Sequence, residues 1–409
     1  MMDAVILKGS ELMKRILVIL LIAALMLCTG ACNRESVPNP MSYPDYTFEQ
    51  TPDTDQLRQT AVRAMRDILS IQWYTKVSYE YYKSGPVSSK QFKYEPGNIY
   101  AGILYSNASA GLFQFMEYYD QKTGIFEYPD SVNKLKTDLG ISCADAVLWA
   151  WSTVCNSITG GFYPKTMVIK NGYIPVGSYT YDETIQDFNY LPTLKIVELN
   201  GKKVMMESYA QVKAADALTT SSDNHAMMAI EDAHVEYLAD GSIDGENSYV
   251  LIQDQRAGGD AWQRTDDRGN VLNYSGRLDG KFSFDKLFEE HFIPVTAAEF
   301  IGQKEYNKSE VTVIGDCKDL TGLQGAAIES NYPLAVINVI ANQDSKETVI
   351  HRELFSGTAM TGVPRTYELS KNDMIRNLSK TDYGKAGTTI KIEVVSATGE
   401  RFIPIELTV

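Results

Sequence analysis

The chain has 409 residues, of which 44% are hydrophobic, and this is enough to form two or three globular domains. Its 52 acidic and 38 basic residues give a net charge of −14. Because nucleic-acid binding needs a basic surface, this charge argues against nucleic acid as a partner.

The first segment has the layout of a secretory signal. Lys14 and Arg15 precede ILVILLIAALML, an apolar run of 12 residues that is too short to cross a hydrocarbon layer of about 30 Å as a helix. The run leads into CTGAC, whose small residues before Cys32 resemble the processing box of bacterial lipoproteins. This resemblance implies that residues 1–32 are a lipoprotein signal peptide and that Cys32 carries lipid, which anchors an extracytoplasmic protein to a membrane of the cell envelope. The alternatives are a non-lipidated signal and an N-terminal anchor helix.

Export changes the cysteine count. If Cys28 leaves with the signal and Cys32 carries lipid, the remaining cysteines are Cys143, Cys155 and Cys317. At least one thiol is then unpaired in a compartment where pairing is usual. If the first two lie in one helix, they are about 18 Å apart along its axis and cannot form a disulfide bond. Cys317 stays a possible partner for either.

The next segments predict a tether and two helices. Residues 33–54 are polar and rich in proline, as expected of a tether from the membrane. Residues 55–71 form a helix by the spacing of their apolar residues, which are Leu57, Ala61, Ala64, Met65, Ile68 and Leu69. A second helix is expected to begin at Cys143, to be capped by Ser142, and to end before the glycines of TGGFYP.

The remainder of the chain is rich in strand-like runs. HAMMAI, AHVEYLAD and SYVLIQDQ follow the second helix, and from about residue 295 six further runs are spaced like the strands of a β-sandwich. The sequence therefore predicts the α+β class. We expect residues 55–294 to form one domain with insertions and residues 295–409 to form an immunoglobulin-like β-sandwich.

Cys143 is the candidate nucleophile. Ser142 as the cap leaves it in the first turn of a helix, where the helix dipole favours the thiolate. A thiol hydrolase also needs an imidazole and a group that orients it, and His225 opens a strand-like run downstream. The alternative is a structural cysteine, because free cysteine packs like a small hydrophobic residue.

Hairpin geometry indicates the third member of a triad. If residues 240–241 form a two-residue turn, His225 lies opposite Arg256, and Asp254 is one diagonal step away. A carboxylate there would hold the second ring N–H and stabilise the imidazolium. A bulge or a longer turn would shift this register and leave two alternatives, Gln253 and Gln255.

Four segments carry a family resemblance. The order YAGILYS, SCADAV, NHAMMAI and VLIQDQ resembles the NlpC-type branch of papain-like cysteine peptidases over residues from about 95 to 265. The resemblance implies a core in which the cysteine-bearing helix packs on an antiparallel sheet. It also implies Cys143 as nucleophile, His225 as general base and Tyr105 beside the oxyanion. The residues that depart from the family pattern are Leu104, Ser142, Ala144 and Asp145.

The resemblance implies that the chain cleaves an amide bond in a cell-wall peptide, through a Cys-His-polar triad and without a cofactor. No His or Cys pair has zinc-ligand spacing, so no metal is expected. Trp262 is a candidate for lining a substrate groove. One alternative is an inactive binding or structural lipoprotein on the same scaffold, which the altered residues around Cys143 favour. Another is a thiol acyltransferase or a lipid-directed hydrolase.

Overall fold

The computed structural model describes residues 43–82, 91–106, 110–128, 139–158, 173–180, 192–256, 263–355 and 364–409. Helices and several sheets are mixed along the chain, which confirms the predicted α+β class. No helix within these ranges is both long enough and apolar enough to cross a membrane. Cys32, the predicted signal peptide and Trp262 lie outside the described residues.

Helix α2 (Thr54–Ser70) confirms the helix predicted from apolar spacing. Asp53 caps its first turn by accepting from the backbone N–H of Gln56, whose side chain in turn accepts from the backbone N–H of Asp53. Leu57, Met65 and Leu69 lie on the buried side of the helix, at 2% exposure or less. The cap and the apolar stripe together explain why the helix begins where it does and which face it buries.

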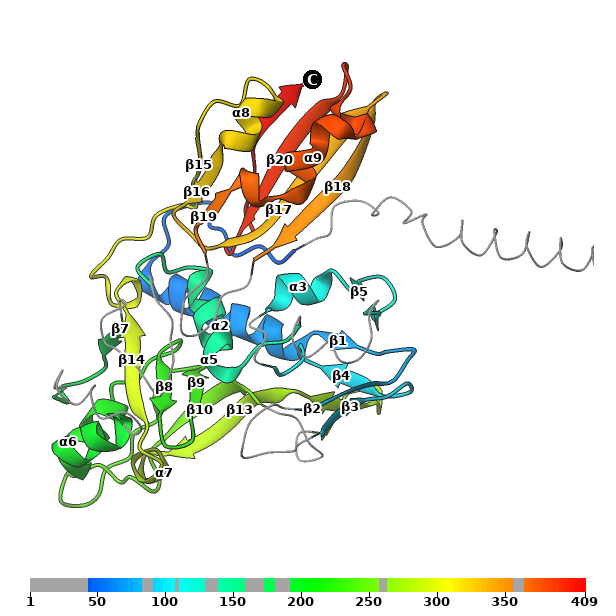
Figure 1. Cartoon of the computed structure of the whole chain (residues 1–409). Coiled ribbons are helices and arrows are strands. Elements are labelled where there is room, and N and C mark those ends of the chain that lie inside the picture. Colours follow the sequence, from blue (N-terminus) through cyan, green and yellow to red (C-terminus); the bar gives the residue numbers. More distant parts are fainter. Residues whose placement is uncertain are drawn as a thin grey trace, which may run out of the picture.

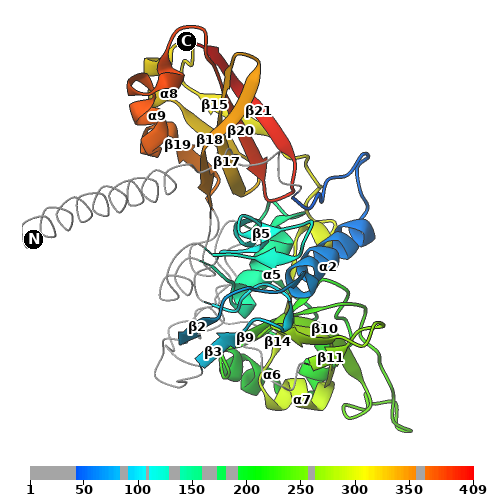
Figure 2. The same ribbon diagram turned by 90° about the vertical axis from the view of Figure 1, so that its right-hand side faces the viewer.

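A six-stranded antiparallel sheet carries His225 and Asp254. Its strands, in spatial order, are β13 (Gly276–Ser283), β10 (Tyr249–Gln255), β9 (His225–Ala229), β8 (Ala217–Thr220), β14 (Ile293–Ala297) and β7 (Tyr173–Pro175). Helix α5 (Cys143–Ser152) packs on β9 and β10, and α2 packs on α5, β10 and β13. Figures 1 and 2 show α2 and α5 between this sheet and the C-terminal strands.

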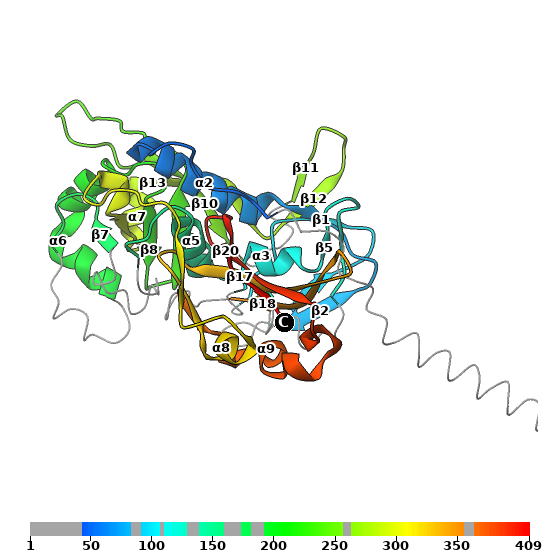
Figure 3. The same ribbon diagram turned by 90° about the horizontal axis from the view of Figure 1, so that it is seen from above.

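Helices and smaller sheets flank the two ends of the six-stranded sheet. Helices α6 (Pro192–Tyr209) and α7 (Phe284–Glu289) lie at one end. At the other end (Figure 3) lies a four-stranded sheet of β1 (Gln72–Trp73), β4 (Ile99–Ala101), β12 (Val271–Tyr274) and β11 (Gln263–Thr265). The nearby short elements are β2 (Tyr79–Tyr82), β3 (Gln91–Tyr94), α3 (Leu112–Met116), β5 (Tyr119–Asp120) and β6 (Ile125–Phe126).

The C-terminal part contains two sheets. One consists of β15 (Val311–Ile314), β16 (Ala327–Ser330) and β19 (Thr366–Glu368), and the other of β18 (Lys346–Leu354), β17 (Leu334–Gln343), β20 (Thr389–Ser396) and β21 (Arg401–Thr408). Short helices accompany them, namely α8 (Leu320–Gly325), η5 (Leu369–Lys371), α9 (Asp373–Asn377), η6 (Leu378–Lys380) and η7 (Asp382–Gly384). Ile328 of one sheet and Ile337 and Ile392 of the other belong to one shared core.

Two predicted boundaries are wrong. The boundary between residues 294 and 295 falls inside β14, where Val295 pairs with β7 and β8. The next element, η4 (Glu299–Ile301), also belongs to the first part of the chain. The predicted tether includes residues that pack against the folded body. Tyr43 and Tyr46 are 8% and 3% exposed, because their rings are buried while their hydroxyls donate to Glu117 and Asp67.

Candidate active site

Helix α5 presents Cys143 at its first position. Ser142 is the N-cap, and its hydroxyl accepts from the backbone N–H of Asp145 while donating to the Asp145 carboxylate at 2.6 Å. Gly140 precedes the cap with φ +103°, and a Cβ there would lie 2.7 Å from the carbonyl oxygen of Leu104. Only glycine permits this approach, which brings the start of α5 beside the segment that carries Tyr105.

The structure pairs His225 with Asp254. The imidazole Nε2 and the carboxylate Oδ2 are 2.6 Å apart, and both side chains are buried. Strands β9 and β10 pair Ile252 with Ala229, which is the register expected from the hairpin. Past the end of β9, however, Tyr237 pairs with Ile243, so the connection is longer than the predicted two-residue turn.

The two glutamines that competed with Asp254 point elsewhere. The amide nitrogen of Gln253 donates to the carbonyl of Val62, and that of Gln255 donates to the carbonyl of Ile103, both at 2.9 Å. These bonds hold β10 against α2 and against the segment after β4. Asp254 is therefore the residue of the three that contacts the imidazole.

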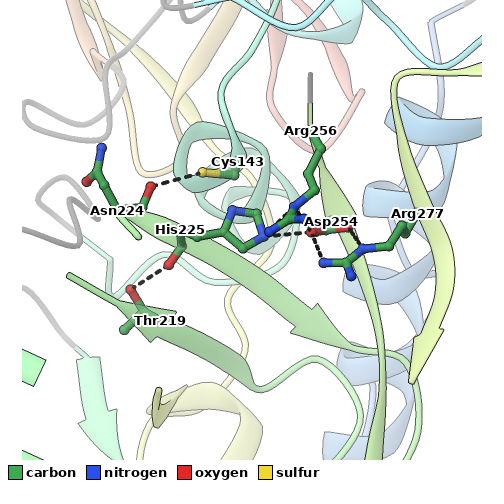
Figure 4. A network of polar contacts seen from close by, with 7 residues as sticks. All are labelled: Cys143, Thr219, Asn224, His225, Asp254, Arg256 and Arg277. Atoms are coloured by element: carbon green, nitrogen blue, oxygen red, sulfur yellow. Dashed lines mark hydrogen bonds and ion pairs between the residues drawn. The ribbon is translucent and has the colours of Figure 1, made fainter. Parts of the chain in front are cut away.

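The thiol of Cys143 lies against the other side of the His225 ring. Its sulfur is 3.8 Å from the carbonyl oxygen of Asn224. Figure 4 shows the ring between the sulfur and Asp254, with Nδ1 on the side of the sulfur. Asn224 has φ +50°, a left-handed conformation that asparagine tolerates, and this turn sets the start of β9.

Electrostatics favour a thiolate and an imidazolium at Cys143 and His225. Burial alone would raise the pKa of the Cys143 thiol, but the charge of His225, its hydrogen bond and the N–H of Ala226 lower that pKa below its usual value. Burial alone would lower the pKa of His225, but the thiolate and Asp254 raise that pKa to about 9. Both shifts favour the thiolate–imidazolium ion pair over the neutral pair.

Tyr105 and Asp145 complete the surroundings of the sulfur. Burial, and then the negative charge of Cys143, raise the pKa of the Tyr105 phenol well above its usual range. The phenol therefore keeps its proton at neutral pH and can donate a hydrogen bond. The charge of Asp145 acts against thiolate formation because it raises the pKa of Cys143.

Two arginines next to Asp254 are features that the sequence did not reveal as part of the site. Arg277 donates to both carboxylate oxygens, and the Nε of Arg256 lies 3.1 Å from Oδ2. Burial alone would raise the pKa of Asp254, but the hydrogen bonds from Arg277 and His225 hold it well below its usual range. The predicted hairpin register placed Arg256 opposite His225, so the sequence contained a signal for Arg256 but none for Arg277.

A separate cavity of about 710 Å³ contains none of these candidates. Its wall includes the buried ion pair of Arg58 with Asp216, and this arginine also donates to the carbonyls of Ala214 and Phe300. Because these bonds go to protein groups, the pair joins α2 to the six-stranded sheet. In the part of the chain that the structure describes, no three His, Cys, Asp or Glu side chains gather to hold a metal ion.

Neither protein-family models, curated proteins nor solved structures match this chain. The functional interpretation therefore depends on the geometry of the site.

Proposed function

We propose that this protein is a cysteine hydrolase of the papain-like, NlpC-type kind that cleaves an amide bond. The observation that carries the proposal is the line of Cys143, His225 and Asp254, in which a thiol at a helix start meets an imidazole that a buried carboxylate holds. A helix packed on an antiparallel sheet supports the papain-like core. Two C-terminal sheets around one core likewise support a β-sandwich domain.

The reaction follows from the protonation states. The Cys143 thiolate attacks the amide carbon, and the carbonyl π electrons move to the oxygen. Tyr105 and the N–H of Cys143 donate to this oxyanion, since an N–H in the first turn of a helix has no acceptor within the helix. The intermediate then collapses as the C–N bond breaks, and the imidazolium of His225 gives its proton to the leaving amine. A thioester on Cys143 remains.

Water completes the cycle. Neutral His225 takes a proton from a water molecule that attacks the thioester carbon, and collapse of the second intermediate releases the carboxylic acid and the Cys143 thiolate. Asp254 accepts a hydrogen bond from the imidazolium in both stages and so stabilises its charge.

We propose a peptide of the cell wall as the substrate and a lipid on Cys32 as the anchor. The apolar run before CTGAC supports export, and an exported thiol hydrolase meets cell-wall peptides in that location. The net charge of −14 agrees with a substrate other than nucleic acid.

The direct test is digestion of purified peptidoglycan, followed by mass spectrometry of the released fragments. Wild type and Cys155→Ala are expected to release the same peptide fragments, whereas Cys143→Ala releases none. Equal release by wild type and Cys143→Ala would overturn the proposal. Transfer of the acyl group to an added amine, without free acid, would identify an acyltransferase. A reactive Cys143 that yields neither product would favour the binding scaffold.

A further inference from the structure

The carboxylate of Asp254 has more positive neighbours than a triad requires. It accepts from the imidazole of His225, and Arg277 supplies two further bonds, from Nε to Oδ1 at 2.8 Å and from the terminal nitrogen to Oδ2 at 2.5 Å. Arg256 approaches the same Oδ2 through Nε at 3.1 Å. Asp254 is fully buried, so both oxygens depend on these protein donors.

Strand pairing places Arg277 there. It is the direct partner of Asp254 in the β10–β13 ladder, next to a register shift between Ile252 and Asp254. Gly276 makes the approach possible, because a Cβ at this position would lie 2.2 Å from the backbone oxygen of Asp254. The guanidinium also lies over the ring of Phe282 at 4.8 Å, which restricts its orientation.

We propose that Arg277 is a positioning residue for the hydrolysis. This inference rests on the proposed function. Arg277 does not face the sulfur and acts through Asp254, whose two oxygens it fixes in one plane and whose ionised form it stabilises. An ionised Asp254 in this orientation can stabilise the imidazolium, and the imidazolium in turn stabilises the thiolate of Cys143.

Arg256 provides a matched comparison from the same neighbourhood. Its side chain is 35% exposed against 12% for Arg277, and it reaches one carboxylate oxygen instead of two. Its Nε is also 3.3 Å from Nε2 of His225. The positive charge of Arg256 therefore opposes protonation of His225 to the imidazolium. Loss of Arg256 should therefore disturb the triad less than loss of Arg277.

The charge balance predicts the direction of the effect. The titratable or charged groups around the imidazole are Cys143, Asp145, Tyr105, Asp254, Arg256 and Arg277. Without Arg277, burial raises the pKa of Asp254. Asp254 then stabilises the imidazolium less, and the pKa of His225 falls. The pKa of Cys143 rises in turn, because its imidazolium neighbour is lost over part of the pH range.

The experiment is the rate of Cys143 alkylation by iodoacetamide against pH, followed by peptide mass spectrometry on the full chain. Arg277→Gln is expected to move the inflection upward and to slow alkylation near neutral pH by about tenfold, the change that one pKa unit produces. Arg277→Lys, with one point charge in place of two parallel bonds, should shift it less. Arg256→Gln should give a smaller shift than Arg277→Gln.

A double variant separates positioning from simple destabilisation. If Arg277 acts through Asp254, then Arg277→Gln adds no further shift in an Asp254→Asn background. An additive shift, or a profile of Arg277→Gln that coincides with wild type, would overturn the inference. If circular dichroism shows that the glutamine variants do not fold, the test uses Arg277→Lys. An alkylation profile of Arg277→Lys with no shift of its inflection would then overturn the inference. Failure of the proposed function looks different, because Cys143 would then react as slowly as Cys155 in the wild-type protein.

Discussion

The two ends of helix α5 place two buried cysteines in surroundings that differ in one decisive group. Cys143 begins the helix and Cys155 follows its end, and their exposures are 5% and 0%. Each has an acid beside it and a tyrosine nearby. These neighbours are Asp145 and Tyr105 for Cys143, and Glu299 and Tyr332 for Cys155.

The pKa values of the two thiols are nevertheless shifted in opposite directions from the usual cysteine value. Burial, and then the charge of Glu299, raise the pKa of Cys155 well above its usual value, although Arg58 opposes this. Burial acts on Cys143 in the same sense, but there His225 outweighs it and lowers the pKa. Burial beside an acid therefore does not lower the pKa of a cysteine in this fold. An adjacent imidazole that Asp254 holds makes the difference.

Replacement of His225 should remove the difference between the two cysteines. His225→Asn loses both the charge that stabilises the thiolate and the proton donor for the leaving amine. We expect hydrolysis to fall by about 10³-fold or more, as for loss of a triad member. Fragment release from peptidoglycan measures this loss, and His234→Asn, which changes an exposed histidine, is the control. Activity within a fewfold of wild type would mean that another group supplies the proton.

The two tyrosines should differ in the same way. Tyr105→Phe removes a proposed oxyanion donor, which is expected to cost about 10²-fold in kcat. Tyr332→Phe removes a hydroxyl that donates to the carbonyls of Asn307 and Val154, so it should affect thermal stability and leave kcat near wild type. Steady-state kinetics on a released peptide fragment separate the two effects. Equal kcat losses in both variants would argue against an oxyanion role for Tyr105.

The pH profile sharpens the comparison without a substitution. Hydrolysis needs the Cys143 thiolate together with protonated His225. Activity should therefore rise as pH passes the lowered pKa of Cys143 and fall as pH passes about 9, where the imidazolium loses its proton. The initial rate at saturating substrate measures both limbs. A rate that keeps rising several-fold above that value would exclude His225 as the acid.

The acids should produce the smallest effects. Asp145→Asn keeps an oxygen that can accept from Ser142 but removes a charge that raises the pKa of Cys143. Alkylation of Cys143 under mildly acidic conditions should then increase a fewfold, by about 2- to 5-fold for a fraction of a pKa unit. Glu299→Gln should leave Cys155 slow, because burial is the main cause of its raised pKa. Slower alkylation of Cys143 in Asp145→Asn would reverse the sign assigned to this charge.

Features of the fold that depend on a local sequence pattern could be predicted from the sequence. The start of α5 at Cys143 followed from capping by Ser142. The β9–β10 register agrees with the predicted one and brings Asp254 to His225, although the predicted two-residue turn is wrong. Arg277 was missed because its approach requires a bulged ladder between β10 and β13 and a glycine at position 276. These are tertiary features without a local signature.

The boundary errors have a similar origin. The predicted boundary between residues 294 and 295 divides β14, whose partners β7 and β8 hold it in the first sheet. The sequence of a strand alone does not identify these partners. The polar, proline-rich composition before α2 gave no sign that Tyr43 and Tyr46 are buried, with their hydroxyls donating to Glu117 and to Asp67 of α2. Composition predicts a solvent-exposed linker, but pairwise packing decides whether one forms.

Site-resolved alkylation of the wild-type protein is the most direct measurement of the central claim. Iodoacetamide labelling at Cys143 and Cys155, followed by peptide mass spectrometry across the pH range, compares both thiols in one sample. We predict that Cys143 reacts readily at neutral pH and below, with an inflection under the usual cysteine value, while Cys155 stays essentially unlabelled. Equal, slow labelling of both cysteines would contradict an activated thiol at Cys143.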